Sequence, residues 1–271
     1  MTEIREISGA GGAGGPEGAP RQPADRAPVD AFGRLVLETM PEESKLGLSL
    51  GFIRTFAVPD IARVLAATGR MTSAPRVRAK ATGVAMFTLI GRGVDSDEGR
   101  PIVEELRRVH ERPGITPELM RYVLACFTVC PLRFIDDHGH RPATPEERSA
   151  AYAFHVGLSD ALGITDITDT TGDPDAGAAS GLAGVERWMR AFEERNFAPS
   201  PEGDALWAAT STGLLGRRLP RPLAGLAPAV AASLLDAPLR EALRIRRAPA
   251  PVRALMSLAL RARAAARRRR T

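Results

Sequence analysis

Three side chains have the types and spacing that a reactive site needs: Arg78, Thr82 and His110. Arg78 and Thr82 stand four residues apart, about one helical turn, on a stripe that becomes apolar further along. A guanidinium and a hydroxyl in this arrangement can line a pocket and donate hydrogen bonds into it. His110 ends a second apolar stripe, and a neutral imidazole on such a face can ligate the iron of a haem.

Each of these residues also has a simpler structural explanation. An arginine within a helix often extends its charged head to solvent, and a threonine there often bonds a backbone carbonyl. A single histidine on an apolar face is often a core residue satisfied by hydrogen bonds. Spacing alone therefore leaves both interpretations of Arg78, Thr82 and His110 open.

Two predicted helices position these residues. The first opens at Thr72 or Ser73 and runs to about Ile90, and the second starts from an Asp95–Glu98 capping pattern and runs to about Arg112. A short glycine-rich turn joins them, so we expect them to run antiparallel. At about 1.5 Å per residue, Thr82 lies roughly 14 Å and His110 roughly 21 Å from the turn.

The rest of the chain also has helical periodicity, and no stretch alternates apolar and polar residues over the length of a strand. We therefore predict an all-α fold. The other predicted helices are Leu46–Phe56, Asp60–Thr68 with Gly69 as its cap, Thr116–Pro131, Leu132–Asp137, Thr144–Gly163, Val185–Arg195, Pro201–Leu215, Leu223–Leu235 and Pro251–Ala266.

The length suits one large domain or two small ones, and we predict a single globular domain. The chain has 271 residues, of which 44% are hydrophobic and 25% charged, as is usual for globular proteins. Residues 1–27 are rich in glycine, proline and alanine and are predicted to be disordered. The domain is predicted to occupy residues 28–260, followed by an arginine-rich tail, residues 261–271.

The positive charge is concentrated in that tail. The net charge is +5, but the last eleven residues carry six arginines and no acid, so residues 1–260 sum to −1. A near-neutral body argues against nucleic-acid binding. The stripe of Leu255, Leu258 and Leu260 leads into the tail, for which three interpretations stay open: a weak peripheral contact with an anionic membrane, nucleic-acid binding, or a solvated terminus.

The remaining candidate ligands are predicted to be structural. Cys126 and Cys130 lie in an apolar run and are expected to be buried, reduced thiols. His138 and His140 have no third ligand nearby, and His155 lies within a helix. The sequence shows no secretory signal and no apolar run of membrane-spanning length, which predicts a cytoplasmic location.

Several stretches, in order, resemble one protein family. They share loose motifs at consistent spacing between about residues 48 and 262: Phe52–Leu65, Arg78 with Thr82, Gly93–Arg100, Leu106–His110, Tyr122–Phe127, Arg141–Arg148, Trp188 with Glu193 and Glu194, and Leu219–Leu223. This text is similar to the MpaB-type oxygenases, the family that also contains the bacterial rubber oxygenases called latex-clearing proteins.

The resemblance implies an oxidoreductase, a haem-dependent oxygenase whose all-helical domain encloses haem b. His110 would be the proximal iron ligand, and Arg78 and Thr82 would line the oxygen side of the haem. The implied partners are O₂ and an apolar, unsaturated, prenyl-like molecule, whose double bond is cleaved or which is hydroxylated. Rubber-cleaving members carry a lysine where this chain has Ala81, which predicts an open distal site. The alternative function is a non-catalytic haem sensor or carrier.

Overall fold

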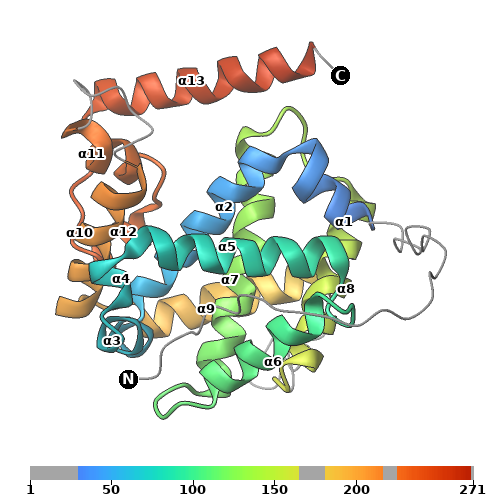
Figure 1. Ribbon diagram of the computed structural model, residues 1–271. Helices are drawn as coiled ribbons and strands as arrows, with labels where there is room; N and C mark the ends of the chain where they lie inside the picture. Colours follow the sequence, from blue (N-terminus) through green and yellow to red (C-terminus); the bar gives the residue numbers. More distant parts are fainter. Residues whose placement is uncertain (1–29, 165–180, 216–224, 270–271) are drawn as a thin grey trace, which may run out of the picture.

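The computed structural model describes residues 30–164, 181–215 and 225–269, and these residues form helices and no strand. The all-α prediction is therefore confirmed (Figure 1). The predicted disordered segment, residues 1–27, lies outside the described residues. The elements are α1 (Ala31–Arg34), η1 (Leu35–Thr39), α2 (Pro41–Arg54), η2 (Thr55–Ala57), α3 (Pro59–Ala67), α4 (Arg70–Ser73), α5 (Pro75–Arg92), α6 (Gly99–His110), α7 (Pro117–His138), α8 (Pro145–Ala161), α9 (Leu182–Asn196), α10 (Pro201–Leu215), α11 (Ala227–Ala232), α12 (Ala237–Ala242) and α13 (Ala250–Arg268).

Helix α7 is the central element, and it packs most extensively on α2. The two backbones approach closely at two glycines of α2. A Cβ atom at Gly47 would lie 2.4 Å from the Cα of Pro131, and one at Gly51 would lie 2.5 Å from the carbonyl oxygen of Cys126. This contact explains why α7 continues through Pro131, where we predicted it to end. Packing against α2 offsets the missing backbone hydrogen bond, which costs about 3 kcal/mol in an exposed helix.

The hydrophobic core surrounds α7. Its largest cluster joins α7 to α5, α6, α8 and α9, and includes the stacked rings of Tyr122 and Phe192, whose centroids are 4.5 Å apart. Cys126 and Cys130 are buried free thiols in this cluster, as predicted. Because the core lies on one side of α5 and α6, these two helices form part of the outer layer (Figure 1).

The sequence predicted a helix end correctly where the capping residues lie within one turn of that end. Thr144 and Glu147 form the capping box that opens α8. The predicted start of α6 at Asp95 was wrong, because the Ser96 hydroxyl accepts the hydrogen bond from the Gly99 amide at 2.8 Å and the helix begins at Gly99.

The C-terminal third differs more from the prediction. Helix α12 was not predicted, and α11 is shorter than expected. The last helix, α13, continues to Arg268 and lies across one end of the molecule, far from α6 in Figure 1. Within the described ranges, no helix is both long enough and apolar enough to span a bilayer.

Candidate functional site

The structure brings Arg78 and Thr82 together on one face of α5. The Nη1 of Arg78 donates a hydrogen bond to the Thr82 hydroxyl, which in turn donates to the Arg78 carbonyl at 3.2 Å. Both side chains are half-buried, so neither extends fully into solvent. The predicted one-turn spacing thus produces a linked pair of polar groups.

His110 is the last residue of α6, and its ring is half-buried. The Nδ1 atom is buried and makes no well-formed hydrogen bond with the described residues. Burial is the main cause that lowers the pKa of His110; the Leu106 carbonyl, one turn earlier, opposes it. The charge of Arg78 also lowers the pKa, as does that of Arg112. The imidazole is therefore held neutral, the form that ligates metals.

Helix α6 follows α5 after a short turn, and the two helices are in contact. The turn between α5 and α6 makes this possible. Gly93 adopts φ +91°, a conformation that side chains other than glycine rarely accept. A Cβ atom on Gly99 would lie 2.1 Å from the Gly93 carbonyl, so the turn is closed tightly by two glycines.

The surroundings of the three residues change from polar to apolar toward the core. Ala81 is exposed beside Thr82, whereas Met86 and Leu89 further along α5 are buried. Leu106 packs against the main core cluster one turn before His110. A neutral imidazole, a guanidinium–hydroxyl pair and a nearby apolar layer are a chemically suitable set for a haem. Two clefts of about 340 Å³ and 640 Å³ lie elsewhere, and their walls contain none of the three residues.

The other histidines have structural surroundings. His138 packs edge-on against Phe134, with ring centroids 4.7 Å apart. His140 is buried beneath α13, and its carbonyl accepts a hydrogen bond from Arg268. His155 is buried, with Nδ1 against the Thr128 hydroxyl. No group of three metal-ligating side chains occurs among the described residues.

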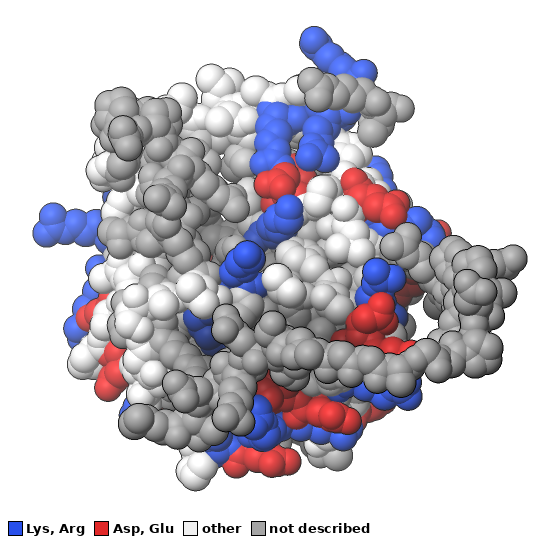
Figure 2. Space-filling view, in the orientation of Figure 1, with Lys and Arg blue, Asp and Glu red and all other residues white. Residues whose placement is uncertain are grey.

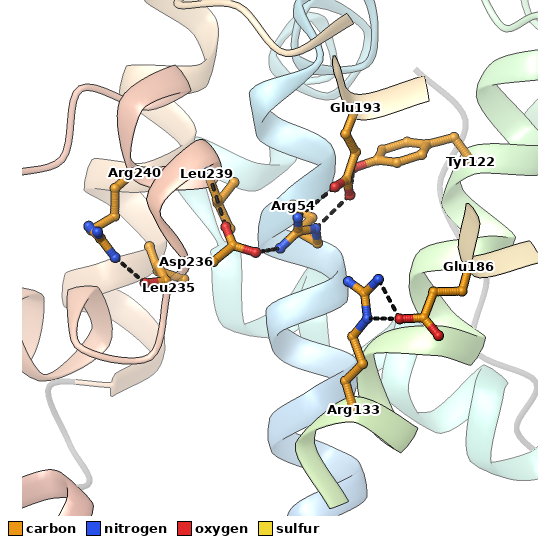
Figure 3. Close-up of polar contacts among 9 residues, drawn as sticks. All are labelled: Arg54, Tyr122, Arg133, Glu186, Glu193, Leu235, Asp236, Leu239 and Arg240. Atoms are coloured by element: carbon orange, nitrogen blue, oxygen red, sulfur yellow. Dashed lines mark hydrogen bonds and ion pairs between the residues drawn. The ribbon is translucent and has the colours of Figure 1, made fainter. Parts of the chain in front are cut away.

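The sequence did not reveal a buried ionic group that is centred on Arg54 (Figure 3). Arg54 donates from Nε and Nη2 to the two carboxylate oxygens of Glu193, each at 2.6 Å, and from Nη1 to Asp236 at 2.5 Å. The Tyr122 hydroxyl donates to Glu193 at 3.0 Å. Burial lowers the pKa of Arg54, but the hydrogen bond and charge of Glu193 outweigh it and raise the pKa above its usual value.

This group joins α2, α7, α9 and the cap of α12. It forms part of the wall of the 640 Å³ cleft, with the half-exposed pair of Arg133 and Glu186 nearby (Figure 3). Within this ionic group, Arg54, Glu193 and Asp236 each have a partner of opposite sign, so these contacts tie the helices together. Glu193 belongs to one of the motifs noted in the sequence, but only the fold pairs it with Arg54.

The chain belongs to the family described as "ER-bound oxygenase mpaB/B'/Rubber oxygenase, catalytic domain", which matches residues 46–268. The predicted family membership is confirmed. No solved structure matches the chain at a significant level.

Three curated relatives from fungi are similar to this chain. The "ER-bound oxygenase mpaB'" of Penicillium brevicompactum is 27% identical over 209 residues, 73% of this chain and 48% of the relative. The "ER-bound oxygenase mpaB" of the same organism is 26% identical over 183 residues, 64% of this chain and 46% of the relative. The protein of that name from Penicillium roqueforti (strain FM164) is 27% identical over 201 residues, 70% of this chain and 66% of the relative. The chain thus spans about half the length of the first two.

Proposed function

We propose that the protein is a haem b-dependent oxygenase that acts with O₂ on an apolar, unsaturated, prenyl-like small molecule. Membership of an oxygenase family supports the reaction class. The observation that carries the site is that Arg78 and Thr82 form a hydrogen-bonded pair on α5, while the contacting helix α6 ends at His110, whose Nδ1 is buried without a well-formed hydrogen bond to the described residues. We infer that these three residues, from two contacting helices, line one site beside an apolar layer.

His110 would hold the iron. Burial lowers the pKa of its ring and so favours the neutral form, in which one ring nitrogen carries the proton and the other has a lone pair for the metal. When bound, haem supplies the chemistry with O₂, and the protein supplies orientation and electrostatics.

Arg78 and Thr82 would act on the oxygen side. A guanidinium stabilises negative charge that develops on oxygen, and the Thr82 hydroxyl, oriented by Arg78, can donate to the same oxygen atoms. The exposed methyl group of Ala81 leaves the space beside Thr82 open to a substrate. The substrate would undergo oxidative C=C cleavage or hydroxylation.

The test distinguishes an oxygenase from a haem carrier. The purified, haem-loaded protein is reduced without O₂ and then mixed with O₂ and a panel of prenylated compounds. We expect O₂ consumption that depends on one class of alkene and is lost in Arg78→Met. Haem binding without O₂ consumption for any alkene would reject the oxygenase in favour of the carrier.

A further inference from the structure

Helix α13 presents an apolar face to solvent. Leu255 and Leu258 are 66% and 65% exposed, the largest such values among leucines in the described residues. At helical spacing they share this face with Pro251, Ala262 and Ala265, which are also exposed. The sequence placed Leu260 on the same stripe, and this was wrong: Leu260 is buried on the opposite side of the helix.

The side of α13 that faces the body carries charge instead. Arg263 pairs with the buried carboxylate of Glu43 at 3.0 Å, and the Arg268 guanidinium donates to the His140 carbonyl. Leu260 and Ala264 fill the space between these contacts. Arginines thus anchor α13 to the body, and this fixes the leucines in the outward direction.

Positive charge lies beside the apolar face and beyond both of its ends. From residue 242 to the end, the sequence has ten arginines and no acid. Arg261 is exposed in the C-terminal half of α13, Arg269 is exposed at its C-cap, and Arg246 and Arg247 are exposed just before its start. Figure 2 shows this rim of the molecule, with uncharged side chains along α13 and basic side chains toward its C-terminal end.

We propose that α13 is a docking surface for an anionic lipid bilayer and lies flat on it, with Leu255 and Leu258 inserted at the boundary between headgroups and acyl chains. A helix with an apolar face bordered by arginines binds in this way, by apolar burial together with attraction to anionic headgroups. A helix of 19 residues provides a contact about 28 Å long. The surface is independent of the site at His110, and it would place the protein where apolar substrates dissolve.

The test is sedimentation of the whole protein with vesicles of phosphatidylcholine, alone or mixed with phosphatidylglycerol. We expect binding to the mixed vesicles, weaker at high salt, and little binding to phosphatidylcholine alone. Leu255→Ser with Leu258→Ser should reduce the partition coefficient at least about tenfold, because leucine burial is the main apolar contribution. Arg261→Gln and Arg269→Gln should each reduce it about fivefold.

The control is Val84→Ser, which removes another exposed apolar side chain, 56% accessible, from α5. It should bind vesicles as the parent does, and all variants should keep the parent's helical circular dichroism. The proposal is overturned if the parent does not sediment with anionic vesicles, or if Val84→Ser loses binding equally. It is also overturned if the parent is a dimer that the two leucine substitutions dissociate without any vesicle binding, because the face would then be covered by a second copy.

Discussion

Removal of Glu193 should destabilise the fold more than removal of any exposed carboxylate. Arg54 is 8% exposed and Glu193 is 6% exposed, and Glu193→Ala deletes both 2.6 Å hydrogen bonds between them. Asp236 remains as a partner, but its side chain is 44% exposed and it binds a single nitrogen. The Tyr122 hydroxyl also loses its acceptor. The variant therefore leaves a buried, under-compensated cation.

The expected loss is about 3–5 kcal/mol in the free energy of unfolding, the usual cost of breaking a buried pair on one side. For a domain of this size it lowers the melting temperature by about 6–20 °C. Urea unfolding followed by circular dichroism measures the first quantity, and a thermal scan measures the second. Glu194→Ala is the matched control, because Glu194 is the exposed neighbour on α9 and should change stability by less than about 0.5 kcal/mol.

A double substitution sharpens the test. Arg54→Met with Glu193→Leu removes both charges and fills the space with apolar groups, so it should cost clearly less than Glu193→Ala alone. If the free energies of unfolding of Glu193→Ala and Glu194→Ala lie within about 1 kcal/mol of each other, the buried ion pair does not stabilise the fold.

Three further predictions follow from particular contacts. Gly51→Ala should lower the free energy of unfolding by about 1–3 kcal/mol, because its Cβ would meet the Cys126 carbonyl at 2.5 Å. The control Gly157→Ala has open space around it and should be neutral or stabilising. Urea unfolding measures both variants. Burial, and secondly the charge of Arg121, lower the pKa of His155 to about 4, so protonation of His155 favours the unfolded chain. The free energy of unfolding should therefore fall by about 3 kcal/mol as the pH drops from 6.5 to 4. His155→Gln should flatten this pH dependence, and an equal slope in both proteins would contradict the prediction. Ala81→Lys should convert the haem spectrum to a low-spin, six-coordinate form, and an unchanged spectrum would mean that position 81 does not face the iron.

Local signals in the sequence predicted much of the fold. The capping box of Thr144 and Glu147 was visible because both partners lie within one turn. Pro131 misled the prediction because the packing of α7 on Gly47 is a tertiary effect, absent from any local window. Helix α12 has only six residues and is held by the burial of Leu239 and Ala242, so it has too little periodicity to be recognised.

In the site, too, contacts within one helix were predictable from the sequence and contacts between distant segments were not. Arg78 and Thr82 were predictable as a pair because one helical turn brings them together. The contact between α5 and α6 depends on the tight turn that joins them, which glycine spacing could indicate. The partners of Arg54 lie 139 and 182 residues away in the sequence, so no spacing rule could connect them. The outward direction of Leu255 likewise depends on where α13 packs.

The most direct test of the central claim is the haem content of His110→Ala, measured by absorption spectroscopy of the purified protein and compared with the parent and with His138→Ala. His138 is also half-buried at the end of a helix, but its ring packs on Phe134 and has no place in the proposed site. We predict that the parent and His138→Ala purify with haem, and that His110→Ala is equally helical but nearly haem-free. A His110→Ala protein with full haem and an unchanged Soret band would contradict iron ligation by His110.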